Sequence, residues 1–290
     1  MVPASTERSV PPTIESMPRT HLPGPRPRKA LGQHFLRDSG VLADIVAAVR
    51  VPPGGIVVEI GAGTGQLTAT LLDAGHTVVA LEVESRMIAH LSSRLGRNPA
   101  LQVVEADARL ADVSEFVPQE RPFVVAGNLP YFAASPIIRH LLEGYPKPKE
   151  MVVMVQREVA REMTAKPGHA SLFTISVQVY AEADLLFDVH PTAFDPPPAV
   201  FSSVVRLVLR DPPLVPLERI DSFFTLVSKT FRNPRKQIHN ALARETGLTA
   251  ELADAVLRLA SIDPTRRAET LSIAEWVGLL DASEELRERA

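Results

Sequence analysis

The sequence predicts an α/β protein with a smaller all-helical domain at its C-terminus. From Lys29 onward, short β-branched and apolar runs alternate with amphipathic stretches, which is typical of a parallel sheet flanked by helices. After Asp211-Pro212-Pro213, apolar residues recur only at helical spacing. The chain has 290 residues, 45% of them hydrophobic, which suffices for one large domain and a smaller one.

Five strands are expected where the chain is continuously apolar, because strands covered by helices on both faces have this pattern. These runs are residues 56–60, 77–82, 101–106, 123–127 and 151–156. Two later runs, at 185–189 and 201–209, are joined through the proline-rich segment 191–198. They predict an antiparallel pair that completes the sheet.

Helices are expected between the strands, at residues 41–49, 66–72, 87–95, 137–142 and 172–180. Ser39 and Ser85 stand before two of these segments and predict N-caps, and Ser135 followed by Pro136 repeats the signal. Two further helices are predicted near 220–227 and 252–259 from the spacing of their apolar residues.

Composition divides the chain into three parts. The first 28 residues contain seven prolines and few large apolar groups, so we expect a disordered proline-rich tail at 1–28. The main α/β domain is then expected at 29–211 and the helical domain at 212–290.

Several classes of protein are disfavoured by composition. The chain has no cysteine, which excludes disulfides, thiolate nucleophiles and cysteine-ligated zinc. No apolar stretch reaches the length of a membrane helix, and the N-terminus has no apolar core of a secretory signal. We therefore expect a cytoplasmic protein with no membrane partner and no metal.

Charge is segregated along the chain, although the formal net charge is only −3. Residues 51–127 hold nine acids against five arginines, a net of −4. Residues 229–244 contain no acid, and their cations are Lys229, Arg232, Arg235, Lys236 and Arg244. Because an anion docks where cations gather, the second segment is the better candidate for binding a polyanion.

A glycine-rich turn follows the first expected strand. Gly61, Gly63 and Gly65 lie between that strand and a helix, and such glycines let the backbone approach a nucleotide-like ligand. Glu82 ends the next strand, where a carboxylate can accept the hydroxyls of a ribose. NAD would suit this pair too, but the spacing is G-x-G-x-G and not G-x-G-x-x-G. A simple tight turn is the other alternative.

Two further polar sites fall at the same edge of the expected sheet. Asp107 follows the third strand, where it could accept an adenine amine or could act only as a helix N-cap. Asn128-Leu129-Pro130-Tyr131 follows the fourth strand. Its amide oxygen, a backbone carbonyl and an aromatic face form a holder for an exocyclic amine on a flat base. The edge therefore predicts chemistry on an adenine nitrogen.

In the order of these motifs, the chain resembles the ribosomal RNA adenine N6-dimethyltransferase (KsgA/RsmA) family. The likeness extends over nearly all of residues 29–280 and includes the blocks 29–36, 155–160, 191–200, 231–240 and 267–269. It implies a Rossmann-like S-adenosylmethionine-dependent methyltransferase fold, with a seven-stranded, mostly parallel sheet and a small helical C-terminal domain for RNA recognition.

The resemblance also implies roles for particular residues. Those expected to bind S-adenosylmethionine are His34, Leu36, Gly61, Gly63, Glu82, Asp107 and Asn128. His34 stands where many relatives have asparagine, so packing is an alternative role for it. Those expected to act in catalysis are Asn128, Leu129, Tyr131 and Phe194, with Tyr131 and Phe194 stacking on an extruded adenosine. A hydrophobic plug is the alternative for Phe194.

The chemistry can be argued from the residues themselves. The lone pair of adenine N6 is delocalised into the ring, which makes N6 a poor nucleophile. If the Asn128 amide oxygen and the Leu129 carbonyl accept both N6 hydrogens, they draw the nitrogen towards tetrahedral geometry and stabilise the positive charge that develops there. The motif contains no general base and needs none for the attack.

Arg232, Arg235 and Lys236 are expected to bind RNA phosphates, although a charged run is more often a solvated face. The resemblance implies dimethylation of two adjacent adenosines in the 3′-terminal hairpin of 16S RNA, within the small (30S) subunit or its precursor, by a monomer with a role in subunit biogenesis. Two alternatives stay open. One is a 23S RNA adenine methyltransferase of the macrolide-resistance type, and the other is a non-catalytic RNA-binding assembly factor.

Overall fold

The computed structural model describes residues 33–246 and 248–288, so the tail predicted at 1–28 lies outside the described residues. A seven-stranded sheet runs through the molecule in the order β4-β3-β2-β5-β6-β9-β7. Strands β4 to β6 pair in parallel, while β9 is antiparallel to both β6 and β7. The strands are β2 (Ile56–Ile60), β3 (Val78–Glu82), β4 (Leu101–Glu105), β5 (Phe123–Asn128), β6 (Glu150–Gln156), β7 (Ala181–Val189) and β9 (Ser202–Leu209).

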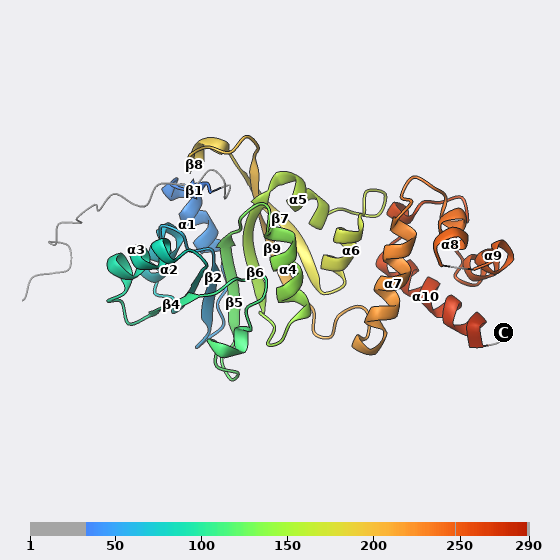
Figure 1. Ribbon diagram of the computed structural model, residues 1–290, viewed down its shortest axis with the longest axis horizontal. Helices are drawn as coiled ribbons and strands as arrows, with labels where there is room; N and C mark the ends of the chain where they lie inside the picture. The colour runs from blue at the N-terminus through green and yellow to red at the C-terminus, as the bar shows by residue number, and fades with distance from the viewer. Residues whose placement is uncertain (1–32, 247, 289–290) are drawn as a thin grey trace, which may run out of the picture.

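Helices cover both faces of the sheet because successive residues of the central strands are buried on opposite sides. Val57 and Val124 pack with the helices of one face, and Val58 and Val125 with those of the other. The first face is covered by α1 (Ser39–Ala48), α2 (Gln66–Asp73) and α3 (Ser85–Leu95), and the second by α4 (Ala134–Glu143), α5 (Arg157–Met163) and α6 (Leu172–Gln178). The predicted seven-stranded α/β fold is confirmed (Figure 1).

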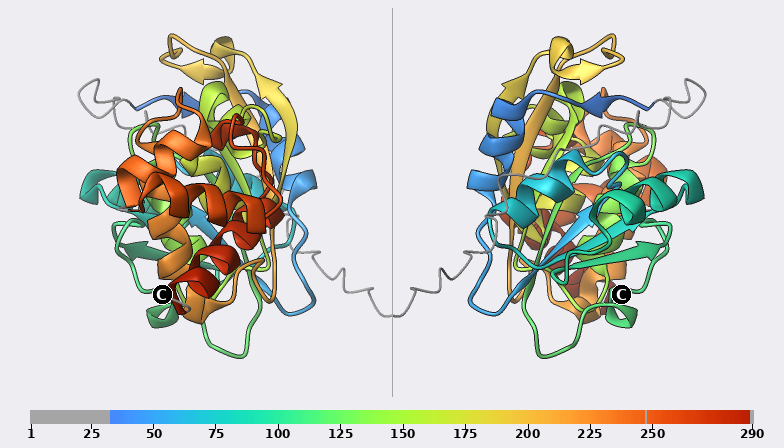
Figure 2. Two further views of the ribbon diagram at one scale, coloured as in Figure 1. Left: turned by 90° about the vertical axis from the view of Figure 1, so that its right-hand side faces the viewer. Right: turned by 90° about the vertical axis from the view of Figure 1, so that its left-hand side faces the viewer.

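Four C-terminal helices pack together at one end of the long axis, opposite α3 (Figures 1 and 2). They are α7 (Ile220–Phe231), α8 (Ile238–Thr246), α9 (Ala250–Leu259) and α10 (Ile273–Glu288). Buried Trp276 on α10 lies against Phe231 of α7, with ring centroids 5.8 Å apart. Within the described ranges, no helix is long and apolar enough to cross a membrane.

The segment around Glu269 joins these helices to the rest of the molecule. The Glu269 carbonyl accepts hydrogen bonds from the backbone N–H groups of Gly168 (2.7 Å) and Ala170 (3.3 Å), which lie between α5 and α6. Two residues earlier, Arg267 forms a β-bridge with Gln237 at the start of α8. The block at 267–269 therefore sets the position of the basic segment before α8 relative to the sheet.

The three predicted serine N-caps are wrong. Helix α1 begins at Ser39, and its cap is Asp38, whose Oδ1 accepts from the N–H groups of Gly40 and Val41. Helix α3 begins at Ser85 itself, and α4 begins at Ala134, with no side-chain cap at either. In each case the helix starts one residue or more before the position that the serine indicated.

Strand ends agree with the prediction to within one residue, except that β7 starts at Ala181 and not at 185. Its first half carries the exposed Glu182 and Asp184, because β7 is the edge strand and needs no continuous apolar run. The predicted helix at 172–180 ends at Gln178.

The sequence did not predict a second, two-stranded sheet. In it, β1 (Phe35–Leu36) pairs antiparallel with β8 (Phe194–Asp195), so that Leu36 stands opposite Phe194. The pair brings the N-terminal segment across the edge where β2, β3 and β5 end (Figure 1). The β1–β8 pair covers that edge of the large sheet.

Candidate functional site

A pocket lies at the carboxyl ends of β2 to β5, beneath the β1–β8 pair. The turn after β2 forms its floor, and there Gly61 and Gly63 have φ values of +71° and +53°. Glycine is required at both positions because side chains rarely adopt these angles. A Cβ on Gly63 would also lie 3.4 Å from the Phe35 ring. The backbone is therefore shaped for close approach of a ligand.

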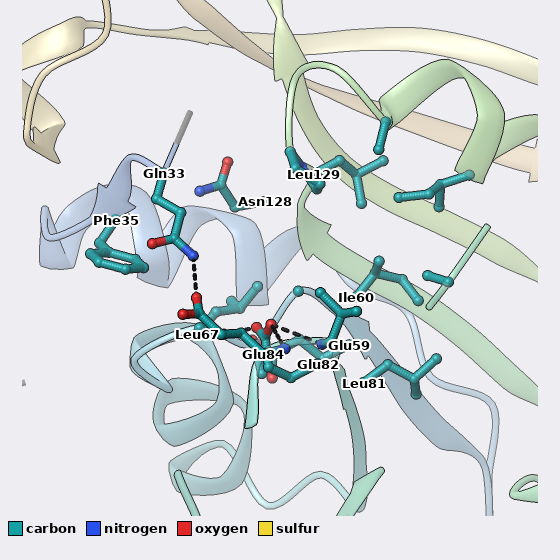
Figure 3. Close-up of a pocket in the computed structure, with 18 of the residues that line it drawn as sticks. Gln33, Phe35, Glu59, Ile60, Leu67, Leu81, Glu82, Glu84, Asn128 and Leu129 are labelled. Atoms are coloured by element: carbon teal, nitrogen blue, oxygen red, sulfur yellow. Dashed lines mark hydrogen bonds between the residues drawn. The ribbon is translucent and has the colours of Figure 1, made fainter. Parts of the chain in front are cut away.

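Glu82 holds this turn in place. One carboxylate oxygen accepts the Gly63 N–H at 2.8 Å, and the other accepts the N–H groups of Val83 (2.9 Å) and Glu84 (3.0 Å). A carboxylate has about four acceptor positions, so roughly one remains for a ligand hydroxyl. Figure 3 shows Glu82 on the side of the pocket opposite Asn128 and Leu129. The sequence had indicated a ligand contact for Glu82 but not this structural role.

Glu59 is a pocket residue that the sequence analysis missed. It lies in β2 with 1% of its surface exposed, and its Oε2 has no hydrogen-bond partner among the described residues. Burial, together with the nearby negative Glu82, raises the pKa of Glu59 to about 7. A signal was present, because an acid inside a continuous apolar run is costly unless it has a partner or a task.

The raised pKa makes the stability of the ligand-free protein depend on pH. Below pH 4.5 the Glu59 carboxyl is neutral in both states, while between about 4.5 and 7 only the unfolded chain releases its proton. Stability therefore falls as pH rises through this window, by about 3 kcal/mol in total. Glu59→Gln should remove this loss, so urea unfolding at pH 5 and pH 8 should show the variant gaining on the wild type at pH 8. An equal difference at both pH values would contradict the prediction.

The segment after β5 forms the opposite wall. The Asn128 side chain donates from Nδ2 to the His34 carbonyl oxygen at 3.1 Å, which turns its Oδ1 away from that contact. The Leu129 N–H donates to the Met154 carbonyl, and the Leu129 side chain is 1% exposed, so the backbone here is fixed. The Tyr131 hydroxyl lies 2.7 Å from Ser202 Oγ, and burial raises the pKa of Tyr131, which keeps the phenol protonated at neutral pH.

The N-terminal segment closes over this wall. His34 Nδ1 lies 2.7 Å from the Pro196 carbonyl oxygen, and the His34 ring stacks on Tyr131 with centroids 5.8 Å apart. Gln33, which the sequence did not single out, donates from Nε2 to Glu84 at 2.8 Å (Figure 3). His34 therefore packs between Tyr131 and the proline-rich loop at Pro196, and Leu36 lines the pocket from β1.

Asp107 lies at the rim of the pocket, directly before the turn at 108–110. No helix follows it, but its side chain caps this turn as an N-cap would, and its backbone carbonyl also accepts the Leu110 and Ala111 N–H groups at 2.9 Å. Its carboxylate accepts the Arg109 backbone N–H at 3.0 Å and forms an ion pair with the Arg109 side chain at 2.5 Å. The hydrogen bonds from the Arg109 side chain, and to a smaller extent its backbone N–H and its charge, lower the pKa of Asp107. The carboxylate is therefore ionised at neutral pH and can accept an N–H donor.

The structure brings most of the predicted residues together. His34, Leu36, Gly61, Gly63, Glu82, Asp107, Asn128, Leu129 and Tyr131 all line the pocket. Phe194 does not line it: its side chain belongs to β8, is 4% exposed and packs in the core with Leu36 and Leu42, so the stacking role stays a prediction that requires this loop to open. Arg232, Arg235 and Lys236 are exposed in the segment between α7 and α8, away from the pocket.

The pocket fits an adenosine ligand that carries positive charge. Its glycine floor admits a nucleoside against the backbone, and the unpartnered Glu59 oxygen offers a buried acceptor to a cationic or N–H-bearing group. The residues that the structure describes contain no group of three or more His, Asp or Glu side chains able to hold a metal ion.

Fold and site together define an S-adenosylmethionine-dependent methyltransferase. The chain belongs to the ribosomal RNA adenine dimethylase family, whose model matches residues 25–279.

Relatives in other organisms support this assignment. The chain is 39% identical over 249 residues to the ribosomal RNA small subunit methyltransferase A of Dehalococcoides mccartyi (strain CBDB1), covering 86% of each chain. It is also 39% identical over 261 residues to the protein of that name from Acinetobacter baylyi, covering 89% of this chain and 93% of the relative.

Solved structures show the same likeness. A dimethyladenosine transferase from Plasmodium falciparum has a TM-score of 0.73 at 26% identity, and the match covers 87% of this chain and 98% of the Plasmodium falciparum chain. The 23S rRNA methyltransferase ErmE has a TM-score of 0.69 at 27% identity, with 86% and 99% covered.

Proposed function

We propose that this enzyme dimethylates N6 of two adjacent adenosines in the 3′-terminal hairpin of 16S RNA and thereby contributes to small-subunit biogenesis. The observation that supports the chemistry is that Asn128 and Leu129 line the same pocket as Gly61, Gly63 and Glu82, on the side opposite Glu82 (Figure 3). The names of the relatives at 39% identity support the small subunit as substrate. The enzyme would act in the cytoplasm as a monomer.

The residues divide the work between donor and acceptor. Gly61, Gly63, Glu82 and Asp107 would hold the adenosine half of S-adenosylmethionine, which supplies an electrophilic methyl group when bound. Asn128 Oδ1 and the Leu129 carbonyl would accept the two N6 hydrogens of the target base. Tyr131 would stack on that base. As the methyl group arrives, these two acceptors meet the positive charge on N6 without having to reorient.

Tethering by His34 supports the orientation assigned to Asn128. Because Nδ2 donates to the His34 carbonyl, the amide presents its oxygen and not its nitrogen to the amine. An amide turned the other way would place N–H groups against N–H groups. The N-terminal segment thus serves the acceptor geometry as well as closing the pocket.

The basic segment between α7 and α8 would supply the phosphate contacts. Arg232, Arg235 and Lys236 are all exposed, and the 267–269 block connects this segment to the catalytic part of the molecule. Phosphate contacts position an RNA without reading its sequence. The segment would therefore fix the orientation of the hairpin, while the pocket selects the base.

Neutralising these three cations should weaken RNA binding in a salt-dependent way. Each lost phosphate contact lowers the slope of log affinity against log salt by about 0.7–0.9, so the triple glutamine variant should lose roughly 2–3 in slope. Titration of unmethylated RNA at several salt concentrations measures this. Arg97→Gln is a control, since Arg97 is exposed and follows the end of α3, which lies at the end of the molecule opposite the C-terminal helices (Figure 1). An unchanged slope in the triple variant would remove the segment from the docking surface.

The substrate is tested by mapping. The enzyme is incubated with methyl-labelled S-adenosylmethionine and with unmethylated small subunits, large subunits or naked RNA, and the labelled nucleotides are located. Label on two adjacent adenosines near the 3′ end of 16S RNA is expected. Label on 23S RNA would establish the macrolide-resistance type of activity instead, and binding without label would establish a non-catalytic assembly factor.

A further inference from the structure

A second cavity opens on the other side of the catalytic wall. It has a volume of about 570 Å³ and lies between the first turn of α5 and the end of the proline-rich loop. Its lining residues are Gln156, Arg157, Glu158, Arg161, Ala199, Val200 and Phe201, none of which lines the first pocket. We call it the α5 groove. Figure 1 shows α5 beside β6 and β9, on the side of β5 away from β2, β3 and β4.

A stack of flat groups forms the wall of the α5 groove. The Arg157 guanidinium lies 4.5 Å from the centroid of the Phe201 ring. The His190 ring meets the Phe201 ring edge to face, with ring centroids 5.0 Å apart. Asp188 stands 4.0 Å from Arg157, and the Arg157 side chain is still 37% exposed. A guanidinium placed over an aromatic ring leaves its other side to a nucleobase.

The α5 groove also offers charge to a phosphate. Arg161 lies one helical turn after Arg157, is exposed, and takes part in no ion pair within residues 33–246 and 248–288. Glu158 lines the groove as well, and Asp188 lies beside Arg157, so the charge offered to a phosphate is that of Arg161. Arginine binds phosphate through a planar pair of N–H donors, which match two phosphate oxygens.

The position of the α5 groove relates it to the target base. Phe201 directly precedes Ser202, whose Oγ lies 2.7 Å from the Tyr131 hydroxyl. Ser202 is also the register partner of Gln156, two residues beyond Met154, which pairs with Asn128. The groove therefore begins where the wall that holds the target adenosine ends, on the side facing α6 and the C-terminal helices.

We propose that the α5 groove binds the RNA nucleotide next to the target adenosine, with its base on the Arg157–Phe201 stack and its phosphate on Arg161. This inference rests on the proposed function, because it assumes an RNA strand at the first pocket. The groove would hold the extruded strand on the path from the pocket to the basic segment before α8. In a substrate with two adjacent adenosines, one would occupy the groove while the other is methylated.

The phosphate contact is tested with Arg161→Gln. This variant should raise the KM for unmethylated RNA about tenfold, the effect of one charged hydrogen bond, and should lower the salt slope by about 0.7. Its kcat and its affinity for S-adenosylmethionine should stay within about twofold of the wild type. Arg97→Gln makes the same charge change away from the groove and should change none of these values. A wild-type KM and salt slope in Arg161→Gln would overturn the phosphate contact.

The base contact is tested by a double-mutant cycle between protein and RNA. Wild-type enzyme and Arg157→Gln are each assayed on hairpins that are intact or have an abasic residue on either side of the target adenosine. If the neighbouring base stacks on Arg157, removing the base on one side should raise KM several-fold for the wild type and much less for the variant. Fully additive effects on both sides would overturn the stacking.

Failure of the two proposals can be told apart. These assays use whichever RNA the mapping experiment shows the wild type to methylate. If the small-subunit assignment is wrong, the label moves to another RNA, and the same variants are measured there. If the groove proposal is wrong, the label stays in place and both variants keep the wild-type KM.

Discussion

Replacing Asn128 by alanine should abolish methylation while leaving cofactor affinity largely intact. The variant loses the amide oxygen that accepts one N6 hydrogen, and it loses the Nδ2 bond of 3.1 Å that ties His34 over the pocket. Removing one such preorganised group from a reacting centre costs about 10²–10³ in rate. Single-turnover methylation with enzyme in excess would measure the loss, and calorimetry would measure S-adenosylmethionine binding.

Asn128→Asp separates the two contributions of this side chain. Aspartate keeps an acceptor for the amine but places a carboxylate oxygen against the His34 carbonyl, so the tether is lost. If accepting the amine is the main task, the aspartate variant should be more active than the alanine variant, with a weakened closure seen as a higher KM. Turnover of Asn128→Ala within about threefold of the wild type would contradict the mechanism.

The strands and the sheet edge that carries the site could be predicted from local patterns, whereas the order of the strands could not. Continuous apolar runs gave β2, β3 and β5, and the rule that ligands bind at the carboxyl ends of parallel strands brought Gly61, Glu82 and Asn128 to one edge. Each of these predictions concerns one strand and the residue that follows it, so a short stretch of sequence is enough to make it.

The closure of the site could not be predicted in this way. His34 contacts Pro196 across 162 positions, and Gln33 contacts Glu84 across 51. The two-residue strands β1 and β8 are too short to have a period, and their pairing is fixed by the loop that packs over the pocket. The burial of Phe194 and the Arg157–Phe201 stack follow from the same loop, so neither could be foreseen from spacing.

Serine positions misled for a local reason. A serine before an apolar run is a frequent N-cap, but Asp38 stands one residue earlier and takes the role in α1. Before α3, the N-cap position is Glu84, whose backbone N–H donates to the Glu82 carboxylate. A sequence pattern locates a helix start only to within one or two residues, so it cannot choose between cap candidates that are one residue apart. Only the backbone hydrogen bonds decide between them.

Gly127→Ala should impair both stability and activity, although Gly127 touches neither ligand. Gly127 ends the buried part of β5, beside Ile60 of β2, and a Cβ there would lie 2.6 Å from the Ile60 carbonyl oxygen. Backbone cannot yield to this contact as a flexible side chain could, so the two strands must separate. Overpacking of this kind costs about 1–3 kcal/mol, which urea unfolding would measure.

The functional effect of Gly127→Ala follows from what the two strands carry. Ile60 precedes the glycine turn that forms the floor of the pocket, and Gly127 precedes Asn128, so a shift between β2 and β5 changes the distance between donor and acceptor. A displacement of about 1 Å costs roughly 10²-fold in rate. Gly278→Ala is the matched control, because a Cβ at Gly278 in α10 meets nothing within 4 Å, and a helical alanine should be neutral or stabilising. If Gly127→Ala keeps wild-type turnover, the spacing of the strands does not set the geometry of transfer.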